Sequence, residues 1–212
     1  MKKRDFKDWH FEEINDEFGY IRHYEDFEML EVWLKAENPI NEAEHKELKY
    51  LSKHLFRNVE AWNEDELKFF FLSPLIRLVD FHSEHYKPFT QRKLSAIIGD
   101  WEVSGIADFF ISTGIQNPKQ PYFFIHEYKS EKRKDNDPLG QLLAEMIVTQ
   151  QLNKFDFPLY GCYIVGRNHF FSVLKEKEYA VSDAFVATSE EDILSIFKMM
   201  RFVKKEIDKH FE

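Results

Sequence analysis

Cysteine is nearly absent from this chain, because Cys162 is the only one among 212 residues. A single cysteine forms no disulfide within the chain, which excludes a disulfide-stapled scaffold and predicts a reducing, cytoplasmic location. Long apolar runs are missing too, so neither a membrane-spanning helix nor a membrane partner is expected. The first residues turn acidic before any apolar run begins, which is not the pattern of a signal peptide.

Positive charge is also scarce. The 29 Lys and Arg residues face 38 Asp and Glu residues, and the formal net charge is -9. Such a balance argues against a surface that coats nucleic acid through bulk positive charge. Contact with DNA or RNA is therefore expected to be local, metal-assisted or supplied partly by a partner subunit. No ATP-binding Gly-Lys loop is present, so any motor function would need a separate chain.

Aromatic residues, by contrast, are abundant, at 17% of the chain with 22 Phe. A chain of this length and apolarity can bury a substantial core as one large domain, or as a domain with an appendage. Residues 1–23 show no clear period and are interpreted as an irregular arm that packs through its aromatic residues Phe6, Trp9, Phe11 and Phe18.

Hydrophobic periodicity and turn signals predict alternating helices and strands in the remainder of the chain. The Ser73-Pro74 step predicts either a break within one helix or the start of a new one, and Gly99-Asp100 predicts a hairpin turn. Helices are predicted over residues 24–36, 41–58, 63–82, 137–152 and 189–207, and strands over 89–98, 101–112, 122–128, 159–165 and 169–174, with 181–187 as an edge strand or a loop.

Acidic residues open the helix that begins after Asn63. Asn63 is predicted to be the N-cap, and Glu66, three residues later, fits the return bond of a capping box. Acids in a first helical turn are also stabilised by the helix dipole, so a purely structural role suffices for them. Glu64 has no capping role, which leaves it as the better candidate for a functional acid.

Two apolar strands carry acids where a strand core should have none. Asp108 lies within the run from Ile106 to Ile111, and Glu127 lies near the end of the run that precedes Lys129. Strand side chains alternate, so Glu127 and Lys129 project from one face, and Asp108 is expected to share a face with Ile106. A buried carboxylate costs several kcal/mol unless it is paired or binds a cation. Hard cations such as Mg²⁺ prefer such oxygen ligands.

The ordered set of helix Glu, strand Asp108, strand Glu127-Tyr128-Lys129 and the following helix with Gln141 resembles the PD-(D/E)xK phosphodiesterase superfamily. It is similar in particular to the nuclease domain at the start of type I restriction R subunits and to related stand-alone bacterial proteins. The resemblance covers roughly residues 63–167. Ala107 stands before the strand Asp in place of Pro, a departure that does not touch the chemistry.

The resemblance implies an α/β fold with a restriction-endonuclease-like αβββαβ core, in which helices flank a central mixed sheet. Residues 61–212 would form this nuclease-like domain, and residues 1–60 a helical N-terminal extension packed on it. The whole chain would form one compact unit, and a homodimer or a separate partner subunit is possible.

The same resemblance implies a metal-dependent nuclease that hydrolyses DNA or RNA. Mg²⁺ or Mn²⁺ would be held by Asp108, Glu127 and the backbone carbonyl of Tyr128, with Glu64 binding directly or through water. Lys129 would position the attacking water or neutralise the transition state.

Substrate contacts are expected beyond the second acidic strand. Lys132, Arg133 and Lys134 leave its end and are candidates for contact with the phosphate backbone, although such runs are usually only solvated. Gln141 would orient Lys129 or contact the substrate, and an exposed first-turn Gln without a function is the alternative.

Other interpretations stay open. The chain could be a catalytically silent member of the fold that binds nucleic acid or protein, or a plain α/β domain in which Glu127 and Lys129 form a structural ion pair. Glu66 rather than Glu64 could be the helix acid. His82 and His85 lie three apart, but no Cys pattern accompanies them, so packing or surface roles are expected.

Overall fold

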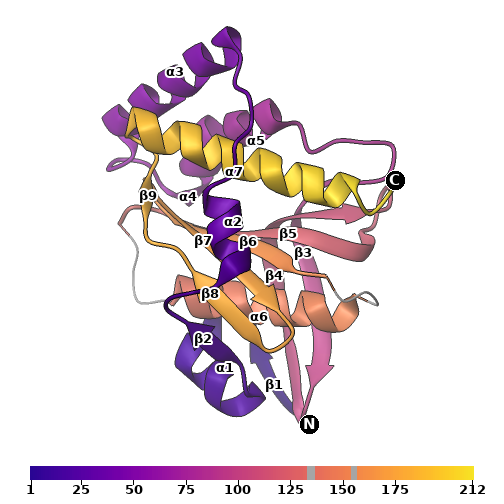
Figure 1. Ribbon diagram of the computed structural model, residues 1–212. Helices are drawn as coiled ribbons and strands as arrows, with labels where there is room; N and C mark the ends of the chain where they lie inside the picture. Colours follow the sequence, from indigo (N-terminus) through magenta and orange to yellow (C-terminus); the bar gives the residue numbers. More distant parts are fainter. Residues whose placement is uncertain (133–136, 154–156) are drawn as a thin grey trace.

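The computed structural model describes residues 1–132, 137–153 and 157–212, and shows a mixed β-sheet with helices on both faces (Figure 1). The predicted α/β class with a central mixed sheet flanked by helices is therefore confirmed. A membrane crossing would need a longer and more apolar helix than any in the described ranges.

The sheet has nine strands within the described residues, and seven of them follow the order β1-β4-β5-β6-β7-β8-β2. Strand β3 pairs with the other edge of β4, and β9 pairs with β7. The pairs β1/β4, β5/β6 and β2/β8 are parallel, and the others are antiparallel. The strands are β1 Lys2–Asp5, β2 Ile21–His23, β3 Lys87–Ile98, β4 Trp101–Thr113, β5 Lys119–Lys129, β6 Leu159–Val165, β7 Asn168–Lys175, β8 Glu178–Val181 and β9 Phe185–Val186.

Helices α1 and α6 cover one face of the sheet, and α2, α3, α5 and α7 cover the other (Figure 1). Each face has its own buried cluster, with Leu142 and Phe110 in the first and Trp33 and Phe124 in the second. The helices are α1 Phe11–Phe18, α2 Glu28–Leu34, α3 Glu42–Asn58, α4 Glu64–Leu67, α5 Ser73–Val79, α6 Pro138–Leu152 and α7 Glu190–Asp208, with a 3₁₀ turn at Phe6–Asp8 and a π-helical segment, η2, at Lys68–Leu72.

The local signals in the sequence predicted most of these elements. The Asn63 side chain accepts from the Glu66 backbone N–H at 2.9 Å, and the Glu66 carboxylate accepts from the Asn63 backbone N–H at 2.8 Å. The capping box is therefore confirmed. The hairpin at Gly99-Asp100 is confirmed as well, with Gly99 in the left-handed region at φ 57°. Ser189 caps α7 by accepting from Asp192 N.

Of the two alternatives at Ser73-Pro74, the start of a helix is confirmed and the break is wrong. The backbone stays helical from Glu64 to Val79, because the π-helical segment joins α4 to α5 without an interruption. Proline is accommodated in the first turn of α5, where its missing N–H costs least. The π-helical segment has a wider turn than an α-helix, and such segments are often found at functional sites.

The interpretation of residues 1–23 as an irregular arm is also wrong. This stretch contains β1, α1 and β2, and its aromatic residues Phe6 and Trp9 are fully buried. Strand β1 pairs with the start of β4, and β2 pairs with β8, so the expected helical extension also supplies strands to the sheet. Gly105 of β4 allows this packing, because a Cβ there would lie 2.5 Å from the Phe6 ring.

Candidate active site

The two acidic strands separate at the position of Asp108. Strand β4 pairs with β1 from Trp101 to Ser104, and its pair with β5 nearest to Asp108 is Phe109 with His126. The Asp108 side chain fills the space that opens there, since its Oδ2 accepts from the Tyr128 backbone N–H at 3.0 Å. A side chain thus completes the hydrogen bonding of a strand that has lost its backbone partner.

The alternation of faces along β4 changes at the same point. Ala107 and Phe110 belong to one buried cluster, whereas Phe109 belongs to the other. Strict alternation would put Ala107 and Phe110 on opposite faces, so the alternation is broken between these two residues. Ile106 itself is 56% exposed. The irregularity brings the Asp108 carboxylate into the gap between strands.

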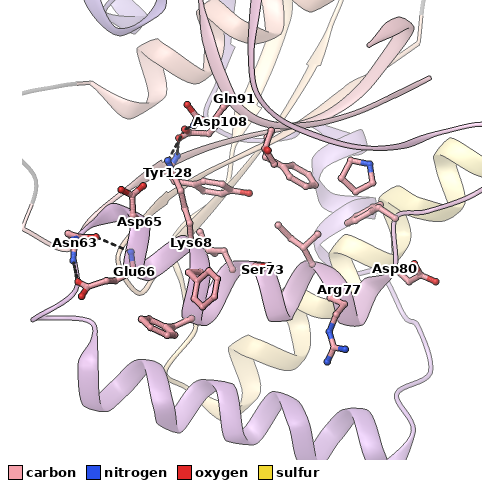
Figure 2. A pocket seen from close by; sticks show the side chains of 18 of the residues that line it. Asn63, Asp65, Glu66, Lys68, Ser73, Arg77, Asp80, Gln91, Asp108 and Tyr128 are labelled. Atoms are coloured by element: carbon pink, nitrogen blue, oxygen red, sulfur yellow. Dashed lines mark hydrogen bonds and ion pairs between the residues drawn. The ribbon is translucent and has the colours of Figure 1, made fainter. Parts of the chain in front are cut away.

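Asp108 holds three donors from three elements (Figure 2). Its Oδ1 accepts from Lys68 Nζ of the π-helical segment at 2.8 Å and from Gln91 Nε2 of β3. Gln91 lies between the pairs that flank Asp108 and has φ 52°, in the left-handed region that non-glycine residues seldom adopt. Unusual backbone of this kind persists where surrounding contacts fix it, and it is concentrated at functional sites.

An ammonium group links Asp108 to the helix acid. Lys68 Nζ is 2.6 Å from Glu64 Oε1 and 2.8 Å from Asp108 Oδ1, so one cation already lies between two carboxylates. Burial lowers the pKa of Lys68, but the charge of Asp108 and hydrogen bonds to both acids outweigh it and the net shift is upward. Of the two helix acids, Glu64 is thus the one connected to Asp108, while Glu66 is engaged in the cap.

The second acid of the site is buried. Glu127 is 1% exposed, and its Oε1 is paired with Lys129 Nζ, which confirms that the two side chains share a face. Burial lowers the pKa of Lys129, but the charge of Glu127 and its hydrogen bond dominate and raise the pKa overall. Asp108 accepts from the Tyr128 N–H, which lies between Glu127 and Lys129 along β5, and Lys68 joins Asp108 to Glu64.

Glu145 of α6 is a further acid that sequence reasoning did not select. It is 0% exposed, burial and then the charge of Glu127 raise its pKa, and Gln141 Nε2 donates to its Oε1 at 3.4 Å. Gln141, expected to orient Lys129, to contact the substrate or to lie exposed without a function, is buried. The sequence signal that could have identified Glu145 is its four-residue spacing from Gln141, on a helix that follows the acidic strands.

Burial favours the protonated forms of the Glu127 and Glu145 carboxyls. Burial and then the charge of Asp108 raise the pKa of Glu127 to about 8, and burial and then the charge of Glu127 raise the pKa of Glu145 well above its ordinary value. The Lys129 ammonium opposes this shift at Glu127, and the Gln141 hydrogen bond opposes it at Glu145. Three oxygens of this cluster are buried and have no hydrogen-bond partner: Oε2 of Glu127, Oε2 of Glu145 and Oε1 of Gln141. Unsatisfied buried oxygens are costly, so this cluster suits a cation or a proton.

The histidines supply no preformed metal centre. His82 lies 3.6 Å from Asp80, His85 stacks on Phe211, and burial lowers the pKa of His126 well below its ordinary value. Across residues 1–132, 137–153 and 157–212, no group of three His, Cys, Asp or Glu side chains is arranged to hold a metal ion. The site offers carboxylates, but Lys68 rather than an open position stands between two of them.

The basic loop is described only in part. Lys132 is exposed at the end of β5, while Arg133 and Lys134 lie outside the described residues. The neighbouring Glu131 binds Arg167, whose Nε is 3.0 Å from Glu131 Oε1.

A cleft of about 880 Å³ opens beside the site, between the α4–α5 helical segment and strands β3 and β4 (Figure 2). Asp108, Gln91 and Lys68 line its inner side, and Phe69 and Phe70 line the helical side. The Asp108 carboxylate is therefore reachable from solvent through a largely apolar opening.

Neither a scan against protein-family models nor a search of curated proteins finds a match for this chain.

Proposed function

We propose that the chain is a metal-dependent nuclease of the PD-(D/E)xK type, which hydrolyses phosphodiester bonds in DNA or RNA with Mg²⁺ or Mn²⁺. The observation that carries the proposal is the gathering of Asp108, Glu127, Lys129 and Glu64 at the point where β4 and β5 separate. The element order α5, β3, β4, β5, α6, β6, with β5 and β6 parallel, is consistent with a restriction-endonuclease-like core.

The donor set fits a hard divalent cation in kind. Asp108, Glu127 and the Tyr128 carbonyl would hold the ion, with Glu64 binding directly or through water, and all are oxygen ligands of the sort that Mg²⁺ prefers. Unpartnered buried oxygens on Glu127 and Glu145 support the fit. A bound divalent ion would lower the pKa of a coordinated water and stabilise charge on the phosphate oxygens.

The side chains around these ligands have separate tasks. Lys129 holds its ammonium beside Glu127 and would donate to the attacking water or to a phosphate oxygen. Glu127 would bind a cation in its deprotonated form, as metal ligands do, so cation binding would release a proton from the Glu127 and Glu145 carboxyls. Lys68 would swing away from the space between Glu64 and Asp108 for that space to be used.

Cleavage assays with purified variants test the proposal. Plasmid, single-stranded DNA and RNA are incubated with Mn²⁺, and we expect cleavage by the natural protein but a loss of at least about a hundredfold in Asp108→Asn and Lys129→Met. Glu102→Gln on β4 and Lys119→Met on β5 are matched controls, because each carries the same change on the same strand away from the site. Metal-dependent cleavage that persists in both site variants would refute the assignment.

A catalytically silent binding module is the second candidate. The Lys68 ammonium favours it, because it already neutralises Glu64 and Asp108 where a metal would be needed. Stable binding of nucleic acid with no cleavage in Mn²⁺, in both the natural chain and Lys68→Met, would support this reading over the enzyme.

A further inference from the structure

A series of aromatic rings runs over the outside of the helical layer, from α3 across the loop to the π-helical segment. We call it the aromatic ladder: Tyr50, His54, Trp62, Phe70 and Phe69. Successive ring centroids are 5.8, 5.2, 5.7 and 5.1 Å apart, and the Tyr50–His54 and Trp62–Phe70 pairs are nearly parallel, at 6° and 29°. Neighbouring rings therefore form one continuous surface.

Three rings of the ladder stand outside the core, and Trp62 packs against its edge. Tyr50 is 60% exposed, Phe69 73% and Phe70 44%. A lone exposed aromatic residue needs no explanation, but a contiguous group of them marks an interaction site. The π-helical segment contributes to this exposure, since its five residues include the exposed Phe69 and Phe70 as well as the Lys68 that contacts Asp108.

The ladder is continuous with the candidate active site. Phe69, Phe70 and Arg77 line the cleft that reaches Asp108, and the same three residues line a second hollow, of about 440 Å³, against Tyr50 on α3. A flexible ligand that lies along the ladder would therefore enter the cleft.

Unpaired cations flank the rings. Lys46 precedes Tyr50 by one turn of α3, Arg57 follows His54 by three residues, and Arg77 points away from Asp108 (Figure 2). Within the part of the chain that the structure describes, none of these three cations forms an ion pair. Their charges are available to anions on a bound ligand.

We infer that the aromatic ladder binds the unpaired bases of a single-stranded nucleic acid and leads the strand into the cleft. The inference rests on the proposed nuclease function and narrows its substrate to single strands. Ring faces stack on unpaired bases of any sequence, and nearby cations contact the phosphates between them. Stacking also suits a chain of net charge -9, which lacks the bulk positive field that attracts duplexes.

Binding measurements on the full chain test this inference. Fluorescence anisotropy is recorded in EDTA, so that no cleavage occurs, with labelled oligothymidine, oligouridine and duplex DNA of about 15 nucleotides. We expect single strands to bind at least about tenfold more tightly than the duplex, and Tyr50→Ala and Phe70→Ala each to weaken single-strand binding about tenfold. The two single-stranded probes separate DNA from RNA.

Phe56→Ala is the matched control, because Phe56 lies on the same helix at 66% exposure but makes none of the ladder's ring contacts. An equal loss of affinity in Phe56→Ala, equal binding of duplex, or no binding at all would overturn the inference. If Phe70→Ala instead converts a dimer into a monomer during sedimentation, the ladder is a contact between copies and the inference fails.

Failure of the inference and failure of the proposed function give different results. Asp108→Ala should bind single strands in EDTA as well as the natural chain does, yet cleave none in Mn²⁺. Normal cleavage by that variant would remove the enzyme proposal and leave the ladder intact. Normal binding by Tyr50→Ala and Phe70→Ala would remove the ladder and leave the enzyme proposal intact.

Discussion

Two ammonium–carboxylate contacts lie side by side where β4 and β5 part, and they differ in what surrounds them. Lys68 bridges Asp108 and Glu64, whose side chain is 40% exposed, next to an open cleft. Lys129 is paired with Glu127, which is 1% exposed and is backed by a second carboxyl on α6. We therefore expect Lys68 to give up its carboxylate partners when a ligand enters the cleft. We expect the Lys129–Glu127 pair to stay in place and to stabilise the fold.

Lys129→Met should have the largest effect on stability. It leaves Glu127 buried beside Glu145 with no cation, and breaking a buried pair in this way costs about 3 kcal/mol or more. The loss should be greatest near pH 8 and smaller near pH 5, where Glu127 takes up a proton instead. Urea unfolding at the two pH values measures it, with Lys119→Met as the control. A loss below about 1 kcal/mol at both would contradict the distinction between the two contacts.

Glu145→Gln should change how stability depends on pH. The folded-state pKa values of Glu127 and Glu145 are raised from 4.5, so the folded chain keeps protons that the unfolded chain releases. The free energy of unfolding therefore falls as pH rises from about 5 towards 8. Removing one titrating group should flatten this decline by up to about 1.4 kcal/mol per pH unit.

Unfolding curves at several pH values between these limits measure the slope. The exposed Glu25→Gln should leave it unchanged, because Glu25 is outside the buried carboxyl pair. Parallel slopes for the natural chain and Glu145→Gln would show that Glu145 does not keep a proton in the folded chain over this pH range.

Substitutions in the two contacts should change the affinity for Mn²⁺ in opposite directions. Glu127→Gln removes a ligand and should weaken the affinity at least about tenfold, which is 1.4 kcal/mol. Lys68→Met removes a competing cation from between Glu64 and Asp108 and should strengthen the affinity. Calorimetry in buffers of different ionisation enthalpy also reports the proton that binding should release. Unchanged affinity in both variants would place any metal elsewhere.

Lys68→Met should have the smallest effect on stability. Its partner Glu64 is 40% exposed, and an ion pair of that kind contributes about 1 kcal/mol or less. Asp108 would keep its bonds from Gln91 and the Tyr128 amide. Thermal and urea unfolding measure the effect, and a loss as large as that of Lys129→Met would mean that the first contact is structural too.

The sequence predicted the parts of the site that have local causes. A capping box is encoded by Asn63 and Glu66, a hairpin by Gly99-Asp100, and the face shared by Glu127 and Lys129 by strand alternation. Each of these signals acts over a few residues, so the fold needs no other part of the chain to realise it.

Features set by tertiary contact were not predictable in the same way. Lys68 follows Glu64 by one helical turn, but nothing local shows that it reaches Asp108 on β4. Glu145 is a helix acid whose burial appears only when α6 packs on β5. The change of faces at Asp108 likewise depends on the irregular backbone of Gln91 on the neighbouring strand.

Strands β1 and β2 have a consequence for the order in which the chain assembles. Lys2 pairs with Trp101 and Ile21 with Glu178, so both short strands wait for partners made much later on the ribosome. Contacts between residues so far apart in the sequence form slowly, because a long loop must close before such contacts can stabilise the chain. The sheet is thus completed at both ends by its earliest residues, and a nascent chain halted before Glu178 would leave Ile21–His23 without their strand partner.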